Sequence, residues 1–222
     1  MNNEKNNITA ESKEKSKIIL HPETIAKDGI EKLLANATIE SFEKVMSLTE
    51  TIRNRMVFLG DIEEETGSSV EQIIRFFNEY DDEQNIALED RQPIKLLIHS
   101  GGGLLSETFT MIDAIERSKT PVWTYNLGCA YSGGFFVFIA GKRRFASKRS
   151  SFLFHEGSGG FQGDANKFQN FADYYKKQRE MLKDLIMEYS NISEDEYKNH
   201  QSEDWWISAQ EGLTKGFVDE IY

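Results

Sequence analysis

The sequence predicts an α/β fold with a largely parallel sheet. Short apolar runs of strand length occupy residues 56–59, 94–98, 122–125 and 151–154. Segments with the apolar spacing of amphipathic helices lie between most of these runs, and glycines follow the first two. Strands that alternate with helices favour parallel strands joined by right-handed crossovers.

The N-terminal quarter of the chain differs in composition from the rest. Residues 1–17 contain almost no apolar side chains, so we expect a disordered polar tail. Residues 18–50 form a second segment with two short apolar sets at helical spacing, and residues 51–222 carry the predicted α/β domain. The first residues lack the apolar run of a signal peptide.

The first helix of the predicted domain follows the strand at 56–59. Ser68 and Glu71 are spaced as a capping box ahead of an apolar stripe over residues 70–77. The acidic run from Glu79 to Asp90 is interpreted as a solvated loop.

Two strand-to-helix turns come next. The strand at 94–98 ends at His99-Ser-Gly-Gly-Gly103 before a helix through residues 109–115, and the strand at 122–125 precedes a helix that begins near Gly133. Caps are expected for three later helices, at Asp164, at Ser193 with Glu196, and at Ser208 with Glu211. The long helix after Asp164 carries an apolar stripe, and Gly216 ends the last helix.

Composition excludes several classes of protein. The 222 residues carry a formal net charge of −11 without a cluster of cations, which disfavours nucleic-acid binding. The single cysteine, Cys129, excludes an internal disulfide and a multi-cysteine metal site, and indicates a reducing compartment. The most apolar stretch, residues 135–140, is far shorter than a membrane span. We expect a cytoplasmic globular protein without a membrane partner.

Glycines 101–103 form a turn between a strand and a helix, and two interpretations are open. The turn can expose backbone N–H groups that hold an anion or an oxyanion, or it can simply require positive φ. The pattern is neither a dinucleotide fingerprint nor a phosphate-binding P-loop.

Ser132 lies between a predicted strand and the helix that begins near Gly133. A serine there resembles a nucleophile elbow, although Ala130 replaces the first glycine of that pattern. An N-cap serine is the equal alternative for this segment.

A nucleophilic serine needs a base, and that base needs an acid to orient it. His155 and His99 both follow apolar strands, and His155 is favoured because glycine and serine residues follow it. His21 and His200 lie in polar surroundings and are expected to be solvated. Asp204 precedes Trp205-Trp206-Ile207, which indicates either a buried carboxylate or a surface acid at the start of an apolar run.

Together these segments resemble the ClpP family, the proteolytic subunits of Clp proteases. The resemblance runs from about Arg55 to Tyr222, and its blocks are Arg55-Met-Val-Phe-Leu-Gly60, His99-Ser-Gly-Gly-Gly103, Gly128-Cys-Ala-Tyr-Ser-Gly-Gly134, Phe154-His155-Glu-Gly with Gly159-Gly-Phe-Gln-Gly163, and Asp204 followed by Ile207-Ser-Ala and Gly216-Phe-Val-Asp219. Their order and spacing make the match specific.

The resemblance implies a ClpP/crotonase-like repeated β-β-α superhelix with a protruding handle helix. It implies a serine endopeptidase that hydrolyses unfolded polypeptides, with Ser132, His155 and Asp204 as catalytic residues. The backbone N–H groups of Gly103 and Gly133 would form the oxyanion hole, and neither a cofactor nor a metal is implied.

The same resemblance implies partners and alternatives. Family members enclose their sites in a homo-oligomeric heptamer or double heptamer, and an AAA+ unfoldase feeds protein substrates into it. A catalytically silent ring subunit and a crotonase-like acyl-CoA enzyme are the alternative functions. The sequence departs from the family where Gly101 and Gly157 replace prolines and where Glu203 replaces an arginine of the inter-ring contact.

Overall fold

The computed structural model describes residues 39–155, 157, 162 and 164–222. By its contacts the chain divides into two units, residues 1–53 and residues 54–222. The described part of the first unit lies in helix α2 (Ile39–Asn54). The predicted tail at 1–17 and most of the segment at 18–50 lie outside the described residues.

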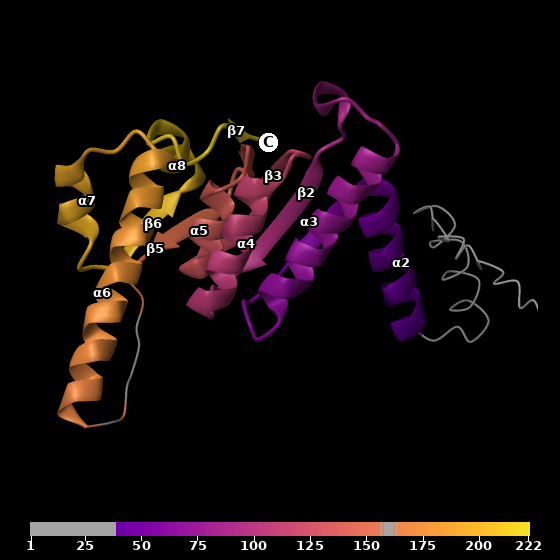
Figure 1. Cartoon of the computed structure of the whole chain (residues 1–222). Coiled ribbons are helices and arrows are strands. Elements are labelled where there is room, and N and C mark those ends of the chain that lie inside the picture. Colours follow the sequence, from indigo (N-terminus) through magenta and orange to yellow (C-terminus); the bar gives the residue numbers. More distant parts are fainter. Residues whose placement is uncertain (1–38, 156, 158–161, 163) are drawn as a thin grey trace, which may run out of the picture. The chain divides into compact units, whose positions relative to one another are not determined.

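The second unit is a mixed α/β structure (Figure 1). Its strands are β1 (Met56–Leu59), β2 (Ile94–Ser100), β3 (Val122–Tyr131), β4 (Arg143–Ala146), β5 (Ser151–Phe154), β6 (Trp205–Ser208) and β7 (Glu220–Ile221). Its helices are α3 (Thr66–Glu83), the short 3-10 helix η1 (Leu88–Asp90), α4 (Leu105–Arg117), α5 (Gly133–Ile139), α6 (Ala165–Glu188), α7 (Glu194–His200) and α8 (Ala209–Thr214).

The strands form one sheet in the order β1-β2-β3-β4-β7, and β5 and β6 extend it from the far end of β3. Each of these pairs is parallel except β5 with β6. Strand β3 is long enough to pair with two strands on the same edge. Its first half pairs with β4, and residues Cys129–Tyr131 pair with β5. The predicted α/β class with a largely parallel sheet is confirmed.

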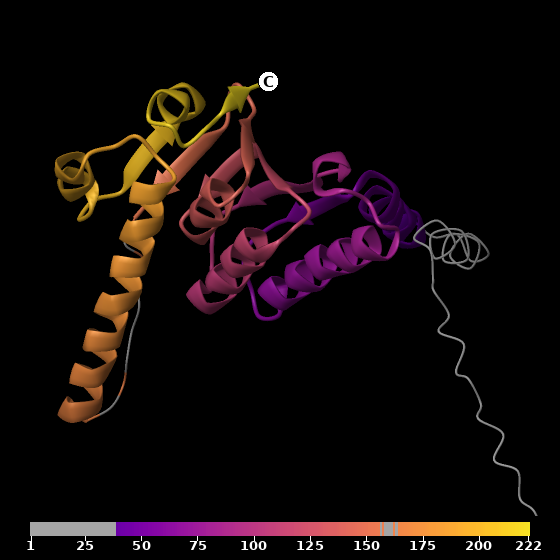
Figure 2. The ribbon, with the colours of Figure 1, turned by 45° about the horizontal axis from the view of Figure 1, so that its top comes forward.

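Helices α3, α4 and α5 lie side by side over one face of the sheet, and α6 extends well beyond them (Figures 1 and 2). Only Leu182 and Ile186 of α6 are buried, both in its C-terminal half. The N-terminal half of the helix therefore projects from the domain, as expected for a handle. None of the helices in the described ranges is long and apolar enough to cross a membrane.

The core beneath the far end of β3 is built from phenylalanine side chains. All seven residues of α5 are buried, and its Phe135 contacts Phe152, Phe154 and Phe217 at ring-centroid distances of 5.1–6.4 Å. Trp205 of β6 contacts Phe154 and Phe217 in the same cluster. These contacts attach α5, β5 and β6 to one another.

Two expectations about the first helix of this unit are wrong. The helix begins at Thr66 rather than behind a capping box, and the Ser68 hydroxyl donates to the Glu65 carbonyl. The acidic run at 79–90 is not simply a solvated loop, because α3 continues to Glu83 and Asp81 is fully buried. By contrast, side-chain capping by Asp164, Ser193 and Ser208 is confirmed.

The Asp81 carboxylate can be buried because a hydroxyl and an arginine donate hydrogen bonds to it and nearby cations compensate its charge. Arg55 donates two hydrogen bonds to the carboxylate, at 2.6 and 2.8 Å, and the Thr120 hydroxyl donates a third at 2.7 Å. Burial by itself raises the pKa of Asp81, but the bonds from Arg55 and Thr120 and the charges of Arg55 and Arg91 outweigh it and leave the pKa below its usual value. The pair ties α3 to the start of β1.

We expect Asp81→Asn to lower the free energy of unfolding at pH 7 by about 3 kcal/mol, because it leaves the Arg55 charge largely buried without its counter-ion. Urea denaturation followed by circular dichroism measures the loss. Glu79→Gln is the matched control, since Glu79 is an exposed partner of Arg75 and such pairs contribute little.

The same pair makes stability depend on pH. The folded-state pKa of Asp81 lies below the unfolded value of about 3.9, so its contribution is present above that value and is lost as pH falls through the folded-state pKa. The difference in unfolding free energy between wild type and Asp81→Asn should therefore shrink in acid. A difference that stays constant down to acid unfolding would contradict this account.

Candidate active site

Ser132 lies between the end of β3 and the first residue of α5, in a backbone conformation that few non-glycine residues adopt. Its φ of 51° and ψ of −122° place it in the positive-φ region. Its N–H donates to the Leu153 carbonyl at 2.8 Å, and its carbonyl accepts from Phe135 N–H at 3.0 Å. The serine occupies the N-cap position of α5, but its side chain makes no capping hydrogen bond. Strained residues held by their surroundings in this way are typical of functional sites.

The glycine turn at 101–103 lies directly against Ser132. Gly102 and Gly103 have φ values of 98° and 149°. A Cβ on Gly102 would lie 2.7 Å from the Ser132 Cβ, and one on Gly103 would lie 2.0 Å from the Ile62 carbonyl oxygen. The positive φ values and the close approaches explain why glycine is needed at these positions. The turn also brings backbone next to Ser132, so the interpretation as an anion-binding or oxyanion-binding turn stays open.

Two neighbouring segments hold the turn in place. Ile62 donates to the Gly102 carbonyl and accepts from Leu104 N–H, both at 2.8 Å. Asp61 accepts the Gly101 N–H at 2.6 Å. Sequence analysis missed both residues, since they lie 40 residues before the turn and carry no local motif.

The backbone N–H groups of Gly103 and Gly133 lie in the same small region. A Cβ on Gly133 would be 3.6 Å from the Gly103 nitrogen, and one on Gly102 would be 3.1 Å from the Gly133 nitrogen. Within the described residues neither N–H donates a hydrogen bond, whereas the N–H groups of Gly101 and Gly102 do. Two adjacent N–H groups without a partner can donate hydrogen bonds to an oxyanion.

His155 and Asp204 flank the antiparallel pair of β5 and β6. Phe154 pairs with Trp205, so His155 and Asp204 are the next opposed positions, and their Nδ1 and Oδ1 atoms are 4.0 Å apart. This distance is an ion-pair contact and too long for a hydrogen bond. The Asp204 side chain is 63% exposed and that of His155 is 30% exposed. Of the two interpretations of Asp204, the structure shows the surface acid.

The other candidate residues of the described chain lie in different surroundings. The His99 ring packs on the Gly128 backbone, and His200 stacks on Trp205 at 4.0 Å, so the expectation of a solvated His200 is wrong. Burial raises the pKa of the Cys129 thiol, which disfavours the reactive thiolate. His21 and most of the glycine-rich loop after His155 lie outside the described residues.

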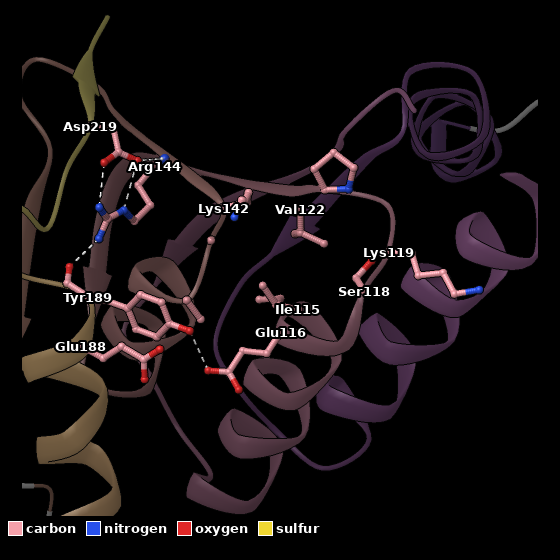
Figure 3. A pocket seen from close by; sticks show the side chains of 13 residues that line it. Ile115, Glu116, Ser118, Lys119, Val122, Lys142, Arg144, Glu188, Tyr189 and Asp219 are labelled. Atoms are coloured by element: carbon pink, nitrogen blue, oxygen red, sulfur yellow. Dashed lines mark hydrogen bonds and ion pairs between the residues drawn. The ribbon is translucent and has the colours of Figure 1, made fainter. Parts of the chain in front are cut away.

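A separate cavity of about 750 Å³ lies at the opposite ends of the strands, between the start of β3 and the end of α6 (Figure 3). Arg144 bonds Asp219 at 2.7 Å and the Tyr189 carbonyl at 2.6 Å, and the Tyr189 hydroxyl donates to Glu116 at 2.9 Å. Burial, with Glu116 as acceptor, raises the pKa of Tyr189. The cavity contains none of the candidate catalytic residues.

No cluster of three His, Cys, Asp or Glu side chains in the described ranges is placed to hold a metal ion. The end of β3 brings together a serine hydroxyl that does not cap its helix, two backbone amides without a hydrogen bond in the described part of the chain, and an imidazole with a carboxylate beside it. These are the parts that acyl transfer to a serine requires.

A family model described as Clp protease matches residues 38–222. The match begins before Arg55 and so includes α2, which the resemblance seen in the sequence does not reach. Clp proteases are serine peptidases. Because the matched region covers most of the chain and the fold is the expected mixed α/β structure, the chain belongs to the Clp protease family.

Proposed function

We propose that this chain is a serine endopeptidase that hydrolyses unfolded polypeptides. The observation that carries the proposal is the placement of Ser132. Its strained backbone is bonded to Leu153, two residues before His155, and its hydroxyl is free of capping. In a structural N-cap the serine side-chain oxygen would instead accept a hydrogen bond from a backbone N–H of the first helical turn.

In the proposed reaction the Ser132 hydroxyl attacks the peptide carbonyl and His155 takes its proton. The tetrahedral intermediate carries its negative oxygen toward the N–H groups of Gly103 and Gly133. His155 then returns the proton to the leaving amine, and water hydrolyses the acyl-enzyme by the same steps. Asp204 orients the imidazole and stabilises its charged form.

Assembly into a ring is part of the proposal. Helix α6 exposes Phe168 and Tyr174 in its projecting half and Met181 just beyond it, each more than half accessible. Exposed apolar side chains on a projecting helix favour a contact with another copy of the chain. We place the peptidase in the cytoplasm, in a heptamer or double heptamer supplied by an AAA+ ATPase.

One observation favours a second candidate, a catalytically silent ring subunit. Asp204 is exposed and lies 4.0 Å from His155, so Asp204 does not hold the imidazole by a hydrogen bond in the isolated chain. Active-site labelling separates the two candidates. A crotonase-like enzyme would instead bind acyl-CoA stoichiometrically and show no peptidase activity.

We expect Ser132→Ala to abolish labelling by a fluorophosphonate probe and to lower peptide hydrolysis by at least about 10³-fold, because the nucleophile is removed. Labelling is read by mass spectrometry of the modified peptide, and hydrolysis by a fluorogenic peptide. Ser69→Ala is the control, since Ser69 is exposed on α3. A wild-type protein that is assembled and yet never labelled at Ser132 would support the silent subunit.

We expect Asp204→Ala to lower kcat/KM by about 10²-fold, clearly less than the loss in Ser132→Ala. The reason is that solvent screens an exposed carboxylate 4.0 Å from the imidazole. Glu203→Gln changes the adjacent exposed acid and should leave kcat/KM within about twofold. Equal rates for Asp204→Ala and wild type would show that Asp204 does not orient His155.

We expect the double variant Phe168→Glu/Met181→Glu to reduce the native mass of the assembly, because two charges would enter an apolar contact. Native mass spectrometry measures the number of subunits. Asn170→Glu adds a charge at an exposed polar position of the same helix and should leave the mass unchanged. A monomeric wild-type protein would contradict the assembly.

A further inference from the structure

Three consecutive glycines, at positions 101–103, form the turn that carries one of the two proposed oxyanion donors. Glycine has more accessible backbone conformations than any other residue, so a turn of three glycines has little tendency to keep one shape by itself. An oxyanion donor must nevertheless lie within about 2.7–3.1 Å of the developing charge, and a shift of about 1 Å can lower a rate about 10²-fold. The turn therefore needs a restraint from outside it.

The hydrogen bonds of the three glycine N–H groups show where that restraint comes from. The Gly101 N–H donates to the Asp61 carboxylate at 2.6 Å, and the Gly102 N–H donates to the Ser100 hydroxyl at 3.1 Å. Within the described residues the Gly103 N–H donates no hydrogen bond. Ser100 is adjacent to the turn, whereas Asp61 precedes Gly101 by 40 residues. Asp61 therefore fixes the start of the turn to a different part of the fold.

Asp61 can act as a restraint because the residue after it is held firmly. Ile62 is buried, its N–H donates to the Gly102 carbonyl, and its carbonyl accepts the Leu104 N–H, both at 2.8 Å. Ile62 and Gly103 form an isolated parallel bridge at this point. The two consecutive residues thus hold the turn at its first N–H, at its second carbonyl and at the N–H of the residue that follows it.

The same segment also reaches the second proposed donor. A Cβ on Gly133 would lie 3.1 Å from the Ile62 Cδ1 atom and 3.6 Å from the Gly103 nitrogen. A Cβ on Gly103 would lie 2.0 Å from the Ile62 carbonyl oxygen. Ile62 is therefore packed against both glycines whose N–H groups are proposed to bind the oxyanion. A shift of the turn relative to this segment changes the distance between the two donors.

The hydrogen bond of Asp61, rather than its charge, is the useful property. A carboxylate near a developing oxyanion opposes it, because like charges repel. The Asp61 side chain is exposed, so solvent screens this repulsion. Its bond to the Gly101 N–H is short, as expected when the acceptor is ionised. An uncharged acceptor of the same shape should therefore replace the carboxylate.

We propose that Asp61 is a positioning residue, which acts through its hydrogen bond to Gly101 to hold the Gly103 N–H in place for the oxyanion. The inference rests on the proposed function and adds a residue outside both the triad and the glycine turn. Because the oxyanion exists only in the transition state and the intermediate, loss of this bond should lower kcat and leave ground-state binding of the peptide unchanged.

The test compares Asp61→Ala with Asp61→Asn, which keeps an acceptor oxygen. We expect Asp61→Ala to lower kcat for a fluorogenic peptide about tenfold with KM within about twofold, a smaller loss than the 10²–10³-fold typical of removing a donor itself. Asp61→Asn should keep kcat within about threefold of wild type, because a neutral acceptor still bonds the Gly101 N–H. Glu63→Ala is the matched control, since Glu63 is an exposed acid two residues later and its loss changes the net charge equally.

A transition-state analogue separates positioning from a general loss of structure. A peptide aldehyde forms a tetrahedral adduct in which the Ser132 oxygen bonds to the carbonyl carbon and the former carbonyl oxygen lies at the proposed oxyanion site. The corresponding peptide alcohol forms no adduct. In Asp61→Ala the inhibition constant of the aldehyde should rise about tenfold, and that of the alcohol should not change. Equal losses for both inhibitors, or an effect on KM alone, would assign Asp61 to substrate binding and overturn the proposal.

Hydrogen exchange keeps the test independent of catalysis. Amide exchange in a peptide that contains residues 99–104, measured by mass spectrometry, should be faster in Asp61→Ala and unchanged in Asp61→Asn and Glu63→Ala. If this is seen while wild type is neither labelled nor active, the proposed function fails and the hold of Asp61 on the turn stands. Unchanged exchange or a wild-type kcat in Asp61→Ala overturns the proposal. A loss in Asp61→Asn equal to that in Asp61→Ala also overturns it, because the charge and not the bond would then matter.

Discussion

The burial of α5 among phenylalanine side chains is the interaction on which the candidate site depends. Phe135 packs on Phe152 and Phe154 of β5, and Phe154 packs on Trp205 of β6. The helix that follows Ser132, the strand before His155 and the strand after Asp204 therefore share one core. A core packed at native density does not let one of these elements shift without the others, so the three residues keep their relative positions.

The glycine turn adds the second constraint. Gly102 and Gly103 bring backbone so close to Ser132 and Ile62 that no side chain fits at either position. The hydrogen bonds of Ile62 to Gly102 and Leu104 then hold the turn in place. The backbone nitrogens of Gly103 and Gly133 lie close together beside Ser132, and in the described part of the chain neither N–H donates a hydrogen bond. In the proposed reaction these two N–H groups stabilise the oxyanion.

The exposure of Asp204 connects the chemistry to assembly. An exposed carboxylate at 4.0 Å orients an imidazole weakly, since water competes for both groups. The projecting half of α6 and its exposed apolar residues belong to the same part of the chain that follows His155. In the proposed ring, a contact that covers this region would lower the local dielectric and strengthen the pair. In the isolated chain His155 and Asp204 are in ion-pair contact at 4.0 Å without a hydrogen bond between them.

Local patterns in the sequence were enough to predict the parallel α/β class, the capping of α6, α7 and α8 by side chains, and the position of Ser132 before a helix. They were not enough for Asp81, which lies in an acidic run and is buried because Arg55 and Thr120, 26 and 39 residues away, satisfy it. They also left open whether Ser132 caps its helix and whether Asp204 is buried. Periodicity and caps act over a few residues, so the sequence by itself determined which elements form. Only the tertiary structure decided which distant groups meet, because burial and charge compensation depend on neighbours that the chain brings together after long connections.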